Sequence, residues 1–146
     1  ATTSTVFSLS AHKEANGGDA GSDGTMIAYC FASVNGYSKI GTYTGNGSTD
    51  GPFIYTGFRP AFIISKRSNT TGNWIMMDST RDPSNVAQSW LYAEGNYTED
   101  TGSSRYVDFV SNGVKFRNSG TGLNNSGSTY IYMAFAEQPF KYANAR

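Results

Sequence analysis

The stretch from Phe53 to Arg67 constrains the fold most, because it contains two β-type runs joined by Gly57 to Pro60. In the second run, Ala61 to Ile64, every residue is apolar, which predicts a strand covered on both faces. The run is short, rich in aromatic and β-branched side chains, and follows a proline, and these features favour a strand over a helix. A covered strand needs neighbours on either side, so the rest of the chain has to supply a sheet.

Further short apolar runs lie between loops of Gly, Asn and Ser along the whole chain. Val107–Phe109 and Val114–Phe116 flank Ser111-Asn112-Gly113, which predicts a tight hairpin with positive φ. No segment has a helical apolar stripe of useful length, apart from a single turn around Ser84 to Gln88. About ten short strands therefore predict an all-β fold with almost no helix, an antiparallel two-sheet β-sandwich. Other strands are expected at Thr5–Leu9, Met26–Ala32, Lys39–Thr44, Trp74–Asp78, Trp90–Tyr92 and Thr129–Ala136.

The composition excludes several classes of function. The formal net charge is zero and only 15% of the residues are charged, so the chain has no basic footprint for nucleic acid and no polybasic face for anionic membranes. Ser, Thr, Asn and 17 Gly make loops that are polar but uncharged, as in many extracellular and virion proteins. No apolar run reaches the length of a transmembrane helix. We therefore expect no nucleic-acid partner and no membrane insertion.

Two stretches of the chain resemble each other, Ser22–Ala32 and Ser126–Ala136. Ser, Thr, Ile, Phe and Ala recur in place, and large and small side chains alternate in the same way. One interpretation is that two buried strands converged on similar residues. The other is that residues 1–35 are N-terminal strands from the tail of a preceding repeat, and that residues 36–146 are the β-sandwich domain. The single cysteine, Cys30, lies in the first stretch, where we expect a small buried hydrophobe.

Long, ordered motifs of the chain resemble one known class of domain, found in tail-fibre-like and other virion proteins of marine bacteriophages. The motifs that carry this resemblance are Ile27–Ala32, Gly36–Gly47, Phe53–Arg67, Asp108–Gly113 and Ile131–Phe140. Together they cover nearly the whole chain from Gly24 onward. The resemblance implies a concanavalin-like or jelly-roll-like sandwich, similar to lectins, on the outside of a phage particle. It implies no activity, because no catalytic or ligand residues can be carried over.

The residues give little support to catalysis or metal binding. His12 is the only histidine and lies alone in a polar loop. No second histidine completes a metal-ligand spacing, and a hydrolase triad is almost excluded. A glycosidase needs two facing carboxylates, no spacing links any two of the candidates, and no aspartate-rich stretch has calcium-loop spacing. We therefore expect a protein that is not an enzyme, with no catalytic residues, no metal and no cofactor. The candidate carboxylates are Asp78, Asp82, Glu94, Glu99, Asp100, Asp108 and Glu137.

A sugar site usually combines exposed aromatic side chains with amides, hydroxyls and short acids. The stretch from Trp90 to Tyr97 has this combination. The two longest polar loops beside it, Ser79–Gln88 and Glu94–Arg105, are the expected recognition loops. The alternative interpretation is that both tryptophans, Trp74 and Trp90, are core residues, because Trp is highly buried on average. The candidate ligand-binding residues are Trp90, Tyr92, Asn96, Tyr97, Arg81 and Asp82.

The residues and the resemblance together predict a non-enzymatic structural or adhesive module on the surface of a phage virion, in a tail fibre or as a capsid decoration. Its expected partners are other virion proteins, copies of itself in a homo-oligomer (a trimer in the first place), and host-surface carbohydrate. Weak contacts repeated in an oligomer would gain avidity through effective concentration. Two alternatives stay open, a carbohydrate-binding module of a secreted enzyme and a capsid-cementing protein that binds no ligand.

Overall fold

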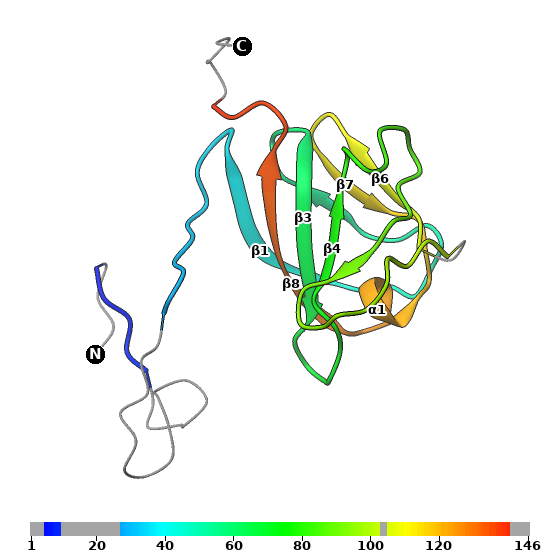
Figure 1. The fold of residues 1–146 in the computed structure, drawn as a ribbon, viewed down its shortest axis with the longest axis horizontal. Helices are drawn as coiled ribbons and strands as arrows, with labels where there is room; N and C mark the ends of the chain where they lie inside the picture. Colours follow the sequence, from blue (N-terminus) through cyan, green and yellow to red (C-terminus); the bar gives the residue numbers. More distant parts are fainter. Residues whose placement is uncertain (1–4, 10–26, 103–104, 141–146) are drawn as a thin grey trace. The chain divides into compact units, whose positions relative to one another are not determined.

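The computed structural model describes residues 5–9, 27–102 and 105–140, and the chain divides into two units, Ala1–Phe31 and Ala32–Arg146. All strands in the described residues lie in the second unit (Figure 1). They are β1 (Ser38–Thr44), β2 (Phe53–Tyr55), β3 (Pro60–Arg67), β4 (Ile75–Asp78), β5 (Leu91–Tyr92), β6 (Val107–Val110), β7 (Gly113–Phe116) and β8 (Thr129–Ala136), with one short helix, α1 (Thr121–Asn124), before the last strand.

The eight strands form two antiparallel sheets, which confirms the predicted all-β fold. One sheet has the order β1-β8-β3-β4-β5 and the other has the order β2-β7-β6. The last strand, β8, lies between β1 and β3, pairing Thr44 with Thr129 on one side and Phe62 with Phe135 on the other. The second apolar run of the Phe53–Arg67 stretch becomes β3, in the middle of the larger sheet, as its sequence predicts.

The two sheets bury a common core between their inner faces. Side chains alternate across a strand, so every second residue of each strand points into this core. The larger sheet contributes Ile63, Ile75, Met77, Tyr132 and Ala134, and the smaller sheet contributes Ile54, Val107, Phe109, Val114 and Phe116. All of these residues are at most 5% exposed, so the arrangement is consistent with a β-sandwich.

The outer face of the larger sheet is also apolar, but it is only half-buried. Phe62 and Ile64 of β3 and Met133 and Phe135 of β8 alternate with the buried residues and point away from the core. Beside them, Ile64, Met133, Trp74 and Glu94 line a shallow apolar hollow. The prediction that the run Ala61–Ile64 is covered on both faces is therefore wrong for the outer face, because the second sheet packs on one side only.

Adjacent residues of β3 provide a direct test of this assignment. Ile63 is 2% exposed, whereas Ile64 is half-buried on the opposite face. We expect Ile63→Ala to lower the free energy of unfolding by about 2–5 kcal/mol, since it opens a cavity in the core. Ile64→Ala should lower the free energy of unfolding by about 1 kcal/mol or less, because the Ile64 side chain is only half-buried and its removal loses less buried apolar area. Chemical denaturation of both variants measures the difference, and equal losses would contradict the assignment of inner and outer faces.

Two stacked tyrosines fix the short helix against the larger sheet. The rings of Tyr43 on β1 and Tyr130 on β8 are 4.9 Å apart and nearly parallel. The Tyr43 hydroxyl donates to the carbonyl of Leu123 at 2.8 Å, and the Tyr130 hydroxyl donates to the carbonyl of Thr121 at 2.8 Å. Burial raises the pKa of Tyr43, so its hydroxyl stays protonated and keeps this donor role.

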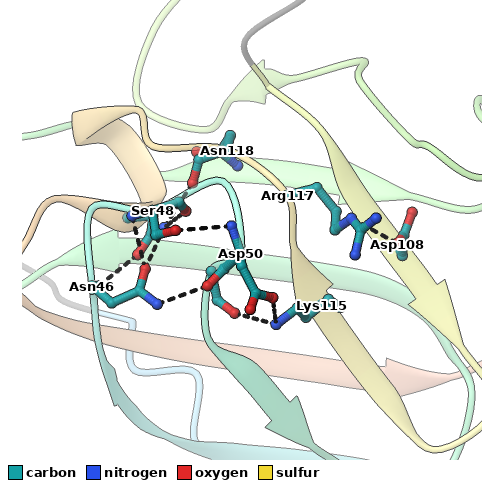
Figure 2. Close-up of polar contacts among 9 residues, drawn as sticks. Asn46, Ser48, Asp50, Asp108, Lys115, Arg117 and Asn118 are labelled. Carbon is teal, nitrogen blue, oxygen red and sulfur yellow. Dashed lines mark hydrogen bonds and ion pairs between the residues drawn. The ribbon is translucent and has the colours of Figure 1, made fainter.

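The amide of Asn124, which is 0% exposed, holds the loop between β1 and β2 onto α1. Its nitrogen donates to the side chain of Asn46 at 3.0 Å and to the carbonyls of Ser48 and Asn118, at 2.8 and 2.7 Å; its oxygen accepts from the backbone N–H of Asn46 at 2.8 Å. Figure 2 shows this loop, in which Asp50 also forms an ion pair of 2.7 Å with Lys115. The β1–β2 loop is thus held by contacts with α1 and with β7.

Several sequence predictions are wrong in detail. The predicted strands Thr5–Leu9 and Met26–Ala32 are wrong: residues 5–9 and 27–32 are not in strands, and Met26 lies outside the described residues. Their apolar runs favour strands, but a local apolar pattern does not decide whether a segment becomes part of a sheet. Cys30 is exposed instead of buried.

Two further local predictions need correction. No helical turn forms at Ser84–Gln88, and the short helix lies at Thr121–Asn124. The predicted hairpin joins β6 to β7 with the pair Val110 and Gly113, so its two turn residues are Ser111 and Asn112. Among the described residues, positive φ occurs at Gly36, Gly47, Gly57, Gly127 and Phe140, and not in this turn. The hairpin is confirmed, but its positive φ is not.

The repeat hypothesis for residues 1–35 stays a prediction that a deletion can test. The carbonyl of Ala32 accepts a 2.7 Å hydrogen bond from Ser38, and the hydroxyl of Ser33 accepts one of 2.9 Å from the N–H of Ile40, so the chain is tied to β1 from Ala32 onward. We expect deletion of residues 1–31 to leave a soluble remainder with a single cooperative melting transition in calorimetry. Aggregation or loss of cooperativity would show instead that the deleted residues are an integral part of the sandwich.

Candidate functional site

The most distinctive surface of the second unit lies at β5, the edge strand of the larger sheet. Two adjoining hollows, of about 300 and about 360 Å³, share Tyr92 and Asn73 as lining residues. Tyr92 is the last residue of β5 and pairs with Ile75 of β4, so its position is set by the sheet. Asn73 lies just before β4, in the turn that follows β3. The volumes are in the range of small-ligand sites.

The loop after β5 turns back and brings a second tyrosine to the first. Trp90 and Asp100 form an isolated antiparallel bridge, with backbone hydrogen bonds of 2.8 and 3.0 Å that close the loop between them. The ring of Tyr97 lies edge-on to that of Tyr92, with centroids 5.6 Å apart. A Cβ atom on Gly95 would lie 2.4 Å from the Tyr97 ring, so glycine is required for this approach. Tyr97 remains 62% exposed.

Tyr92 is anchored by a chain of polar contacts that ends on Trp90. The Tyr92 hydroxyl donates to Oδ2 of Asp100 at 2.8 Å, and the same oxygen pairs with Nη2 of Arg105 at 2.5 Å. The Arg105 guanidinium carbon lies 5.1 Å from the centre of the Trp90 ring, and the indole nitrogen donates to the Arg105 carbonyl at 3.1 Å. Burial and the hydrogen bond to Asp100 raise the pKa of Tyr92. The Tyr92 ring is therefore held in one orientation.

A second polar cluster fastens the same loop to the end of β4. Arg81 pairs with Asp78 at 2.5 Å and with Glu99 at 2.7 Å, so it joins the loop after β4 to the loop after β5. Burial disfavours the charged form of Asp78, but hydrogen bonds from the backbone and side chain of Arg81 outweigh it and lower the pKa of Asp78. The carboxylate of Asp82 accepts from the N–H groups of Gln88 and Ser89, at 2.9 and 2.7 Å.

The far side of the first hollow comes from two segments that are distant in sequence. The end of β3 and the turn that follows it contribute Arg67, Thr71 and Asn73, and the start of α1 contributes Thr121 and Gly122. A Cβ atom on Gly122 would lie 2.9 Å from Ile75, so the glycine allows α1 to approach the sheet closely at this point. The hollow is therefore lined by polar residues together with the aromatic residues Trp90 and Tyr92.

The structure brings some of the predicted ligand-binding residues together and separates others. Tyr92 and Tyr97 meet at the second hollow, as their spacing suggested. Trp90 is only 4% exposed, so it belongs to the core as in the alternative interpretation, although its ring borders the first hollow. Arg81 and Asp82 are engaged with other protein groups, and Asn96 is exposed and lines neither hollow.

The sequence did not predict the contribution of the end of β3 and of the turn that follows it. Arg67 and Asn73 are polar residues in a stretch rich in Ser, Thr, Asn and Gly, which is the only signal the sequence carries for them. Their proximity to Tyr92 follows from the strand order β3-β4-β5, which the sequence does not state. Glu99, Asp100 and Arg105 lie within the loop predicted to take part in recognition, but were not named as ligand residues.

The chemistry of this surface fits binding through hydrogen bonds and ring contacts. Both carboxylates of the second hollow, Glu99 and Asp100, are ion-paired with arginines. Among the described residues, no group of three or more His, Cys, Asp and Glu side chains is placed to hold a metal ion, and His12 lies outside them. Within the same residues, no helix is long and apolar enough to cross a membrane.

The fold defines a domain with two antiparallel β-sheets, and the chain belongs to a family of domains of unknown function. The family model that matches is that of a domain of unknown function, DUF7483, and the match spans residues 1–139. No curated protein and no solved structure matches the chain.

Proposed function

We propose that the domain is a non-enzymatic adhesive module on the surface of a phage virion, in a tail fibre or as a capsid decoration. In this proposal the two hollows around Tyr92 bind a host-surface glycan. The assignment to a virion is supported by the resemblance of the Gly36–Gly47 and Phe53–Arg67 motifs to virion proteins of marine bacteriophages. The assignment of the binding site is supported by the geometry of the hollows.

One observation carries the proposal of sugar binding, the exposed Tyr97 ring braced edge-on by Tyr92 above the second hollow. A sugar offers an apolar ring face and a belt of hydroxyl groups, so it needs an exposed aromatic ring beside polar partners. The same hollow is lined by the amide of Asn73, the hydroxyl of Thr98 and the carboxylates of Glu99 and Asp100. These groups supply both acceptors and donors for hydroxyl groups.

The contacts of the carboxylates favour binding over hydrolysis. A glycosidase requires one carboxylic acid that donates a proton and a second carboxylate that acts as a base or nucleophile. Glu99 and Asp100 instead form ion pairs with Arg81 and Arg105, at 2.7 and 2.5 Å. A shallow site of this size would bind weakly in a single copy, and repetition in a homo-oligomer, which we propose to be a trimer, would supply avidity.

A second candidate function, the cementing protein, is favoured by the apolar outer face of the larger sheet. Phe62, Ile64, Met133 and Phe135 are contiguous across β3 and β8 and half-buried. The occupant would be a second copy of this chain: an apolar sheet face is best covered by another apolar face, and two copies without net charge do not repel each other. A chain that is monomeric at high micromolar concentration in analytical ultracentrifugation would exclude this candidate.

The proposed sugar site is tested by Tyr97→Ala, with Tyr55→Ala as the matched control. Tyr55 is 63% exposed, close to the 62% of Tyr97, but it lies on β2 of the smaller sheet. We expect Tyr97→Ala to weaken glycan binding by about two- to tenfold, the range for losing one aromatic contact of about 0.5–1.5 kcal/mol. The measurement is a glycan array probed with an oligomeric form of the full chain, followed by calorimetry on the hits.

The control decides how the array result is interpreted. Tyr55→Ala should bind as the unchanged protein does, and both variants should unfold at similar denaturant concentrations, since neither ring is in the core. Binding that survives Tyr97→Ala unchanged would remove the hollows from the site. An array without any host-surface glycan binding would contradict the adhesive function and favour the cementing protein.

A further inference from the structure

We infer that the saccharide bound at this site is acidic, and that its carboxylate or sulfate group lies in the first hollow beside Arg67 and Arg105. This inference rests on the proposed function and specifies the class of ligand. It comes from the uneven distribution of charge between the two hollows. The first is lined by both arginines and by no carboxylate, whereas the second is lined by Glu99 and Asp100 and by no cation.

Arg67 provides the uncompensated charge. Among the described arginines, Arg59, Arg81, Arg105 and Arg117 each form an ion pair with a carboxylate. Within the same residues no carboxylate lies within ion-pair distance of Arg67, whose Nε donates only to the side-chain oxygen of Asn69, at 3.3 Å. Arg67 is the last residue of β3, so its backbone is fixed by the sheet while its side chain lines the hollow.

Arg105 is only partly satisfied by the protein. Its Nη2 pairs with Asp100, but its Nε is buried and has no hydrogen-bond partner among the described residues. A buried donor without an acceptor is unfavourable, and such groups in native structures call for an explanation. An anionic oxygen in the hollow that Arg105 lines would offer an acceptor for the guanidinium after a small shift of the side chain. The ring of Trp90 beneath the guanidinium keeps it in place.

The remaining lining fits the rest of an acidic sugar. A guanidinium presents planar, paired N–H groups that match the two oxygens of a carboxylate or sulfate. Thr71, Asn73 and Thr121 add hydroxyl and amide groups around the same hollow, and Asn73 and Tyr92 continue into the second. A ligand of more than one sugar unit would place its anionic group at the arginines and a neighbouring ring against Tyr97.

The test uses the full chain and three oligosaccharides that share one glucan backbone: neutral, sulfated, and oxidised to uronate. We expect at least one acidic form to bind about tenfold more tightly than the neutral form in calorimetry at low salt, the gain typical of charge-assisted hydrogen bonds. Arg67→Gln should abolish this preference, so that the acidic forms bind no more tightly than the neutral form does to the same variant. Lys39→Gln, which removes an exposed cation of β1, should change neither, as a control for general charge effects.

The outcomes separate this inference from the proposed function. A preference for the sulfated or the uronate form supports the inference and identifies the anion. Equal affinity for all three forms, or a preference that survives Arg67→Gln, overturns the inference. If Tyr97→Ala still weakens binding of the neutral form under those outcomes, the proposed sugar site stands without its acidic specificity. Absence of binding to all three forms, together with a silent array, overturns both.

Discussion

The buried side chain of Asn124 is the contact on which the rest of the structure depends. Its amide satisfies acceptors on the β1–β2 loop and on the segment before α1, and a single residue thus joins three parts of the chain. A buried amide is stable only when its donors and acceptors are paired, and those of Asn124 are. The hydroxyls of Tyr43 and Tyr130 fix the same short helix from the sheet side. A helix of four residues has too few internal hydrogen bonds to form without such contacts.

This anchoring extends to the candidate site. Thr121 and Gly122 of α1 form one wall of the first hollow, so the position of that wall is set by Asn124 and the two tyrosines. The opposite wall follows from the sheet, since Arg67 ends β3 and Tyr92 ends β5. The loop carrying Tyr97 is held at both ends, by the Trp90–Asp100 bridge and by the ion pair of Arg81 with Glu99. The site is therefore a set of loops on a rigid scaffold, where binding residues are commonly found.

The apolar pattern of the sequence correctly predicted those segments that pair with a neighbouring strand in the structure. The β3 and β8 runs and the β6–β7 hairpin are confirmed, because continuous or alternating apolar residues reflect burial in a sheet. The same pattern misled at Ile27–Ala32, where Ile27 is 75% and Tyr29 is 80% exposed. Local sequence specifies the tendency to form a strand, but pairing depends on a partner elsewhere in space.

The site was harder to predict than the fold, for a related reason. Tyr92 and Tyr97 are near in sequence, so their cluster could be predicted from spacing. Arg67, Asn73 and Thr121 reach the same hollow only through the strand order and the placement of α1. Burial distinguishes the two aromatic residues: Trp90 lies in the core, whereas Tyr97 is exposed at the second hollow.

The most direct test of the account is a map of the binding surface by nuclear magnetic resonance. The full chain, labelled with ¹⁵N, would be titrated with the sulfated glucan oligosaccharide while backbone amide shifts are followed. We predict that the changes are confined to Arg67–Asn73, Tyr92–Asp100, Arg105 and the start of α1. Changes centred on the outer face of the larger sheet, around Ile64 and Met133, or no changes at saturating concentration, would contradict it.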